Sequence, residues 1–342
     1  DIIEQESIFD ENLNTKYVDG NGIGHRYSLI TAALLGTSIH YSFSQCGKTM
    51  ALSQYGNKLI RLDIDRVLSS KKEDKETQDF LYSFQKQTEE QIKKLMPKEN
   101  VNYSGGVAQN VLANTTFLNY KNFKIDPICT DAGTSLGLLN YYLKGKLNKV
   151  SNMYLGPLPN YDYLFLFKNY KLKKSLDYKV AAILKDEPVA IFQGRSEQGQ
   201  RGLGNRSLLM NPHNKKCVEK INQIKKREWY RPFSPSVLEE KASDYFDIDK
   251  SSPHMLYTYK TKINLPSVSA VNGTSRVQTV SKKQNKNFYS LLKESENILL
   301  NTSLNFPGHV IVENLFDLKY MMDNSPLKYA WLPDIQVLIQ KD

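Results

Sequence analysis

Two consecutive stretches of the chain repeat one order of patterns: a short apolar run, a polar turn containing glycine, and a run with apolar residues at helical spacing. They are NVNYSGGVAQNVLANTTFLNY and FKIDPICTDAGTSLGLLNYYLKG. Strands that alternate with helices in this way are typical of α/β layers, in which helices cover a sheet. Residues 76–97, which precede them, have apolar residues three and four apart and end at Pro97, so they predict an amphipathic helix.

The chain has 342 residues, which is enough for two domains. NMYLGPLPNYDY, residues 152–163, has two prolines and a glycine without periodicity and predicts a linker. We therefore expect an α/β domain over 1–150, a linker over 151–173 and an α+β domain over 174–342. The second domain should contain helices near 174–185, near 214–226 and at NFYSLLKE, and strands at PVAIFQG, ILLNTSLN and HVIVEN.

The formal net charge is +10, which would suit a nucleic-acid partner if the basic residues clustered on one element. The lysines are instead spread along the whole chain among acidic residues, so the sequence disfavours nucleic acid. Cys46, Cys129 and Cys217 stand far apart, in no metal-binding or disulfide pattern, which suits a reducing cytoplasm. No apolar run approaches the roughly 18 residues of a membrane span, so we expect no membrane partner.

The stretch FQGRSEQGQRGLGNRS, residues 192–207, places Arg195, Arg201 and Arg206 among four glycines. Guanidinium groups grip phosphate or carboxylate with two bonds at a time, and glycines allow backbone amides to join them. Asn205 and Ser207 add neutral donors. Like charges this close repel one another, so the stretch favours an anion-binding loop over the alternative of a solvated basic loop.

Further candidate phosphate-binding side chains lie downstream. KKREWYRPFSPS contains a basic cluster, NGTSRVQTV contains an arginine, and LLNTSLN places polar side chains at the end of a strand. Several such groups on one domain indicate a polyanionic substrate such as ATP or an acyl phosphate. The residues concerned are Lys226, Arg227, Arg231, Arg276, Asn301, Thr302 and Ser303.

Two turns in the first domain are also candidate sites. Ser104, Gly105 and Gly106 lie between a strand and a helix, where free amides and the helix dipole favour a nucleotide phosphate. The alternative is a tight turn that needs glycine for its own geometry. Asp131 follows a strand and either caps a helix or binds a hard cation such as Mg²⁺ or Fe²⁺. The five histidines show no metal-binding spacing.

Ordered segments resemble the O-carbamoyltransferases of nodulation-factor and antibiotic biosynthesis along nearly the whole chain. VDGNG (18–22), KTMALSQYG (48–56), SGGVAQNVLAN (104–114) and TDAGTSLG (130–137) are similar to motifs of the family's N-terminal domain. FQGRSEQGQRGLGNRSLLMNP, REWYRPFSPSVLEE, SSPHML, NGTSRVQTV and LLNTSLNFPGHVIVEN resemble its C-terminal domain.

The resemblance implies part of an actin/Hsp70-like (ASKHA) α/β domain, N-terminally truncated, followed by a YrdC-like α+β domain. The second domain would make carbamoyl adenylate from ATP and carbamoyl phosphate. The first would transfer the carbamoyl group to a hydroxyl of a metabolite, sugar or nucleoside with the help of a divalent metal, Fe²⁺ or Mg²⁺. A mixed anhydride of this kind divides one difficult transfer into two easier steps.

The resemblance also implies roles for individual residues. Catalytic positions are Arg195, Arg201, Arg206, Arg231, Arg276 and Ser303. Nucleotide-binding positions are Ser104, Gly105, Gly106, Asn110, Gly133, Lys226, Asn205 and Ser207. Metal ligands are Asp19 and Asp131, together with histidines of a His-His-x-x-His motif. We expect that motif just before or at the start of the chain, where Glu4 stands, so an N-terminal fragment or a second copy would complete the site.

Two alternatives remain open at this stage. One is an enzyme related to tRNA threonylcarbamoylation, in which both half-folds recur and which the basic charge favours. The other is a nucleotide-binding subunit or remnant of a split carbamoyltransferase.

Overall fold

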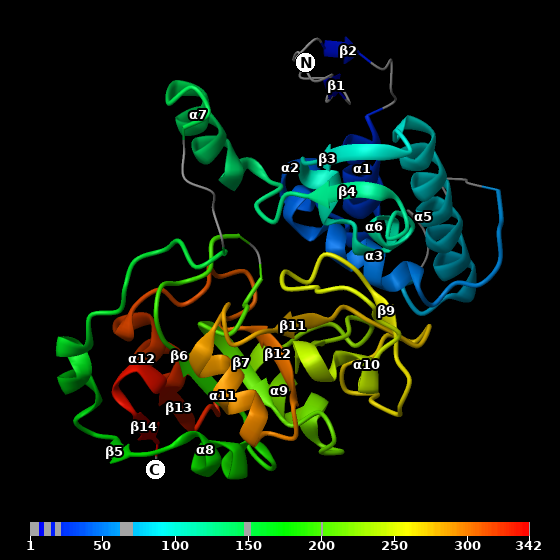
Figure 1. The fold of residues 1–342 in the computed structure, drawn as a ribbon. Coiled ribbons are helices and arrows are strands. Elements are labelled where there is room, and N and C mark those ends of the chain that lie inside the picture. The colour runs from blue at the N-terminus through cyan, green and yellow to red at the C-terminus, as the bar shows by residue number, and fades with distance from the viewer. Residues whose placement is uncertain are drawn as a thin grey trace. The chain divides into compact units, whose positions relative to one another are not determined.

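The computed structural model describes residues 7–9, 15–17, 22–61, 71–146, 152–199 and 201–341. The chain divides into two compact units, Asp1–Asp131 and Ala132–Asp342. Figure 1 shows the elements of both units. Residues 152–173, expected as a linker, belong to the second unit.

The first unit packs helices around one long helix, α5 (Lys75–Leu95), whose buried face includes Phe80, Leu81 and Phe84. The predicted amphipathic helix at 76–97 is thereby confirmed. It ends at Leu95 because the next residue, Met96, precedes a proline and is pushed out of the helical region to ψ 125°. The other elements are β1 (Ser7–Phe9), β2 (Thr15–Tyr17), α1 (Ile23–Leu35), α2 (Ile39–Ser42), η1 (Phe43–Gln45) and α3 (Cys46–Ser53).

The expected strand, glycine turn and helix follow α5 in the same unit. They are β3 (Glu99–Tyr103), the single 3₁₀ turn η2 (Gly106–Gln109) and α6 (Val111–Thr115), and β3 pairs in parallel with β4 (Lys121–Ile125). The repeat after β4 continues through η3 (Asp131–Gly133) into α7 (Thr134–Tyr142), which the contacts assign to the second unit.

The second unit is built on an eight-stranded mixed sheet in the order β11-β8-β12-β7-β6-β13-β14-β5. In Figure 1 the neighbouring strands β6, β7 and β12 lie side by side. The strands are β5 (Lys171–Lys174), β6 (Val189–Phe192), β7 (Arg206–Met210), β8 (Ser234–Leu238), β11 (Gln278–Val280), β12 (Ile298–Ser303), β13 (Tyr329–Leu332) and β14 (Val337–Gln340). A separate pair consists of β9 (Tyr259–Lys260) and β10 (Thr274–Ser275).

Helices α8 (Asp177–Leu184) and α11 (Lys286–Glu294) bury Leu184, Phe288 and Leu291 against the sheet in one hydrophobic cluster. Apolar burial of this kind is the main stabilising contribution to such a layer. The remaining helices are η4 (Tyr161–Phe167), α9 (Cys217–Lys225), η5 (Glu239–Lys241), α10 (Ala242–Tyr245), α12 (Leu315–Asp323) and η6 (Pro333–Ile335). The expected mixture of strands and helices is confirmed, including α8, β6, α9, α11 and β12.

The strand expected at residues 309–314 is wrong. Val310 is 89% exposed and Val312 is 5% exposed, although the two would share one face of a strand, so the segment does not have the burial pattern of a strand. The amides of Glu313 and Asn314 donate to the carboxylate of Asp317, which belongs to the capping of α12. A helix cap therefore takes the amide hydrogen bonds that a strand would have needed.

Candidate functional site

The arginine-rich stretch is a connection between the antiparallel neighbours β6 and β7, and we call its described residues, 193–199 and 201–205, the arginine loop. Its internal anchor is Glu197, whose Oε1 accepts the backbone N–H groups of Leu203, Asn205 and Arg206 at 2.7, 2.8 and 3.2 Å. Burial raises the pKa of Glu197, while these amides act in the opposite direction. The carboxylate folds the loop around itself.

Two glycines allow the loop to approach its neighbours. A Cβ at Gly204, which has φ +108°, would lie 2.2 Å from the ring of Phe288. A Cβ at Gly202 would lie 2.8 Å from the Cα of Ser303. Because any larger residue would clash, the sequence brings the backbone beside Arg201 directly against the end of β12.

Arg206 begins β7, so it lies outside the loop in which the sequence placed it, and its side chain is 0% exposed. Its guanidinium donates to the carbonyl oxygens of Gln193 and Gly194 and lies 4.0 Å from the ring centroid of Phe192. Burial lowers its pKa, and the charges of Glu197 and others act in the opposite direction. In this conformation Arg206 ties together the two ends of the arginine loop.

Asn205, Ser207 and Arg195 also hold the loop. The Asn205 amide donates to the carbonyl oxygen of Arg195 at 2.7 Å, and the Ser207 hydroxyl, in β7, accepts the N–H of Gly204 at 3.0 Å. Arg195 is exposed, and its Nη1 donates to the carbonyl oxygen of Gly156 at 2.9 Å.

The other predicted cations gather at one end of the sheet. β12 runs antiparallel to β7 and β8, and β11 runs parallel to β8. The last residues of β12 therefore lie at the same end of the sheet as the first residues of β7, β8 and β11. Arg201 precedes β7, Arg231 precedes β8, Arg276 precedes β11 and Ser303 ends β12.

Burial, and then mutual repulsion, lower the pKa of two of these cations. Burial lowers the pKa of Arg276 well below its ordinary value, and Arg201, Arg227 and Arg231 lower it further. Burial also lowers the pKa of Arg227 to about 9, with Arg231 and Arg201 as the next causes. Arg231 pairs with Glu228 at 3.0 Å, which offsets part of the repulsion. We call Arg201, Lys225, Arg227, Arg231 and Arg276 the cation cluster.

Hydrogen bonds hold the cluster to the strand ends. Arg276 Nε donates to the hydroxyl of Ser234 at 3.0 Å, and Arg227 Nη2 donates to the hydroxyl of Thr302 at 3.3 Å. Ser234 in β8 is paired across the sheet with Asn301 in β12. The guanidiniums are thus fixed in direction, as a phosphate-binding site requires.

Lys225 and Asn305 belong to this site, although the sequence analysis did not select them. Lys225 is 6% exposed and donates to the carbonyl oxygen of Ser303 at 2.6 Å and to Asn305 Oδ1 at 2.6 Å. The predicted residue, Lys226, is exposed at the end of α9 with φ 44°. Lys225 stands four residues after the buried Ile221 and so on the same helix face, a signal that could have identified it.

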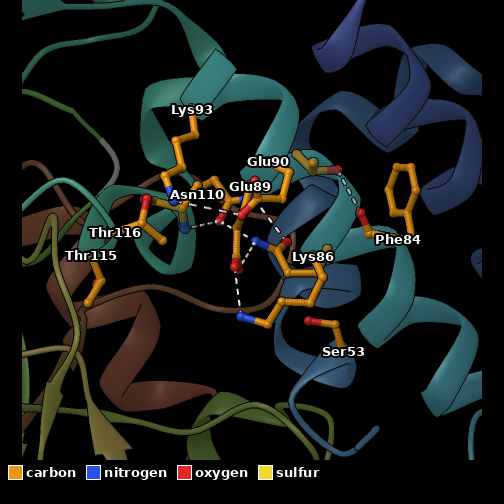
Figure 2. A network of polar contacts seen from close by, with 12 residues as sticks. Ser53, Phe84, Lys86, Glu89, Glu90, Lys93, Asn110, Thr115 and Thr116 are labelled. Carbon is orange, nitrogen blue, oxygen red and sulfur yellow. Dashed lines mark hydrogen bonds and ion pairs between the residues drawn. The ribbon is translucent and has the colours of Figure 1, made fainter. Parts of the chain in front are cut away.

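In the first unit, Ser104, Gly105 and Gly106 form an exposed turn, and Gly105 has φ +101°. Asn110 is buried: its Oδ1 caps α6 through the N–H of Ala113, and its amide pairs with that of Gln85. Figure 2 shows this network, in which Glu89 also receives a bond from Lys86 at 2.7 Å. Asn110 therefore caps α6, the helix that follows the turn, and joins it to α5.

The predicted metal ligands do not form a described site. Asp131 is exposed at the start of η3, and Gly133, with no capping side chain, precedes α7. Asp19 lies outside the described residues. Within the described ranges, no three His, Cys, Asp or Glu side chains are close enough to hold a metal ion. The residues described do not by themselves fit a metal ion, and the two-Asp site stays a prediction.

The second unit is thus a mixed α/β fold that gathers one buried and four half-buried cations at one end of its sheet. Residues 180–340 match the family described as carbamoyltransferase C-terminus. The chain is 33% identical over 245 positions to nodulation protein NolO of Bradyrhizobium diazoefficiens, covering 63% of this chain and 44% of that protein. The chain belongs to the O-carbamoyltransferase family.

Other relatives extend the match. An uncharacterized protein of Methanocaldococcus jannaschii is 31% identical over 362 positions, covering 86% of this chain and 58% of that protein. Nodulation protein U of Sinorhizobium fredii is 37% identical over 140 positions, covering 38% of this chain and 25% of that protein. The chain thus spans about half the length, or less, of the curated relatives it matches. No helix in the described part of the chain is both long and apolar enough to cross a membrane.

Proposed function

We propose that this chain carries the carbamoyl-activating step of an ATP-dependent O-carbamoyltransferase. The substrates would be ATP and carbamoyl phosphate, and the final acceptor a hydroxyl of a metabolite, sugar or nucleoside. The observation that carries the proposal is the cation cluster, because several cations held beside one another in a poorly solvated place need a polyanion to balance them. A cytoplasmic location suits three free cysteines.

Carbamoyl activation would proceed in two steps. Water cleaves carbamoyl phosphate into carbamate and phosphate, and an oxygen of carbamate then attacks the α-phosphorus of ATP. The bond from that phosphorus to pyrophosphate breaks, and pyrophosphate leaves with the electron pair. Arg201, Arg227 and Arg276 would neutralise the phosphate oxygens and so permit one anion to attack another.

Lys225 would act within the same cation cluster. It fixes the positions of Ser303 and Asn305, whose polar groups lie beside the cluster. Its ammonium adds positive charge where the leaving pyrophosphate develops negative charge.

The transfer step would use the first unit and the parts that the longer relatives have. The acceptor oxygen attacks the carbamoyl carbon, AMP leaves with the electron pair, and the hydroxyl proton passes to solvent. The open glycine turn at 104–106 is the candidate position for the nucleotide phosphate, and Asp19 and Asp131 are candidate ligands of the divalent metal.

Pyrophosphate release from ATP, measured with and without carbamoyl phosphate and without acceptor, tests the proposal. We expect release that depends on carbamoyl phosphate, reduced at least about 100-fold by Arg201→Ala, as for loss of an electrostatic catalytic group. Arg61→Ala, at an exposed arginine of the first unit, is the matched control. Full activity in Arg201→Ala, or no dependence on carbamoyl phosphate, would contradict the proposal.

A further inference from the structure

Residues 152–161, which we call the strap, pack along the arginine loop. The N–H of Gln198 donates to the carbonyl oxygen of Met153 at 2.7 Å, and the N–H of Gly156 donates to that of Ser196 at 3.1 Å. The two backbone segments run in opposite directions, and Met153 is 2% exposed. The strap, which the sequence predicts to be part of a linker, therefore pairs with the arginine loop through backbone hydrogen bonds.

Tyr154 fastens the strap to the far arm of the loop. Its hydroxyl donates to the carbonyl oxygen of Leu203 at 2.9 Å and accepts the Asn285 amide at 3.2 Å. Burial, and then the charge of Glu197, raise the pKa of Tyr154, so the phenol keeps the proton that it donates. Leu203 lies two residues after Arg201, so this bond restrains the arm that carries a cation of the cluster.

The strap also holds the near arm of the loop. Arg195 Nη1 donates to the carbonyl oxygen of Gly156 at 2.9 Å. Tyr161 and the N–H of Gly194 both donate to Oδ2 of Asp334 at 2.7 Å. The strap therefore sets the direction of the exposed guanidinium as well as the position of the loop's first turn.

Gly156 is the point of closest approach. A Cβ there would lie 1.8 Å from Ser196 Oγ and 3.2 Å from the carbonyl oxygen of Ser196. The Ser196 hydroxyl cannot simply turn away, because it donates to the carboxylate of Glu313 at 2.8 Å. A side chain at position 156 would thus separate the strap from the loop.

We propose that the strap is a positioning element that holds the arginine loop in its anion-binding shape, with Tyr154 and Gly156 as positioning residues. Ordering a glycine-rich loop costs conformational entropy, and a loop that is ordered in advance binds its ligand with less loss. The ligand named here rests on the proposed function, whereas the ordering of the loop does not.

Tyr154→Phe tests the proposal, with Tyr163→Phe as the matched control. Tyr163 is 39% exposed and lies in η4, beyond the strap. Amide hydrogen exchange of residues 194–205 should rise about tenfold in Tyr154→Phe, as expected when one restraining hydrogen bond is lost. The dissociation constant for inorganic pyrophosphate should rise roughly fivefold, and the KM for carbamoyl phosphate should follow it while kcat changes less than about twofold.

Gly156→Ala should produce the same changes more strongly, whereas Gly47→Ala, at a glycine of α3 with open space around it, should not. Loop exchange and pyrophosphate affinity that match those of Tyr163→Phe would overturn the positioning role. If exchange responds as expected but no carbamoyl-phosphate-dependent turnover occurs even in the unmodified protein, the proposed function fails and the positioning role stands.

Discussion

The ammonium nitrogen of Lys225 lies 2.6 Å from the carbonyl oxygen of Ser303, and so joins the end of α9 to the end of β12. The same nitrogen donates to the carbonyl oxygen and to Oδ1 of Asn305 at 2.7 and 2.6 Å. These oxygens replace water around a buried charge. Burial lowers the pKa of Lys225, and Arg227 and Arg231 add to that effect. These hydrogen bonds therefore hold the ammonium in place, although the charges of Arg227 and Arg231 repel it.

Replacing Lys225 by methionine should reduce pyrophosphate release at least about 100-fold. The change removes the positive charge and leaves the carbonyl oxygens of Ser303 and Asn305 without their donor. We therefore expect slower catalysis and a less ordered segment at 303–305. Steady-state pyrophosphate release and inorganic pyrophosphate binding measure the effect.

Two comparisons make the Lys225 result specific. Lys328→Met, at an exposed lysine of the same unit, should retain the activity of the unmodified protein. Lys226→Met examines the residue that the sequence selected, and a larger loss there than in Lys225→Met would reverse our placement of the site.

Glu197→Gln should loosen the arginine loop. The substitution keeps an oxygen that can accept the amides of Leu203 and Asn205, but it removes the negative charge near the buried Arg206. We expect a loss of about 1 to 3 kcal/mol in the unfolding free energy of the second unit. Urea denaturation followed by fluorescence measures it, because both tryptophans, Trp229 and Trp331, lie in that unit.

Glu219→Gln, at an exposed position of α9, is the matched control and should shift the midpoint little. Equal midpoints for Glu197→Gln and the control would mean that the carboxylate does not organise the loop.

Local patterns allowed much of the fold to be predicted from the sequence. α5 was recognisable because its apolar residues repeat at helical spacing and Pro97 prevents its continuation. The strand–turn–helix at 99–115 was recognisable because glycines separate an apolar run from a helical pattern, and Gly105 indeed has a positive φ in the turn. Such signals lie within a few residues of one another and do not depend on the rest of the chain.

The candidate site was less predictable because it depends on register and facing. Arg206 lies in the same basic stretch as Arg201, yet it begins β7 and turns its guanidinium onto backbone carbonyl oxygens. Lys225 and Lys226 are adjacent, but Lys225 ends α9 on its buried face, whereas Lys226 follows the helix in the left-handed region at φ 44° and is exposed. The basic composition of the sequence indicates that cations cluster, whereas the packing of α9 decides that Lys225, and not Lys226, belongs to the cluster.

The thiol of Cys217 gives the second unit a dependence on alkaline pH. Burial raises its pKa from 9.0 to about 12. Below pH 9 the thiol is protonated in both the folded and the unfolded chain, so its contribution to stability is fully present there. As the pH rises from 9 towards 12 the unfolded chain loses the proton first, and stability falls.

Wild-type protein should therefore lose about 1.4 kcal/mol more from this group at pH 10 than at neutral pH, and Cys217→Ala should not. The difference in unfolding free energy between the two proteins should shrink by that amount, measured by tryptophan fluorescence in urea. Cys46→Ala, in the first unit, controls for general alkaline effects. A difference that stays constant between the two pH values would show that Cys217 ionises equally in both states.

The polar network behind the glycine turn should stabilise the first unit. Asn110 and Gln85 exchange two amide hydrogen bonds of 3.1 Å, and the Tyr27 hydroxyl donates to Gln85 Oε1 at 2.8 Å. Asn110→Ala would remove the cap of α6 and the two bonds to the buried Gln85 amide, which would keep only its bonds with Tyr27 and Glu89. We expect a loss of about 2 to 4 kcal/mol, the sum of a lost cap and the lost bonds to a buried amide.

The two units can be separated in the measurement, since the first contains no tryptophan. Asn110→Ala should lower the urea midpoint seen by far-ultraviolet circular dichroism, which reports the helices of both units, and change the tryptophan transition little. Asn57→Ala, at an exposed asparagine of the first unit, should leave both transitions in place. If Asn110→Ala behaves as Asn57→Ala does, the buried amide pair and the cap of α6 contribute nothing measurable to the stability of the first unit.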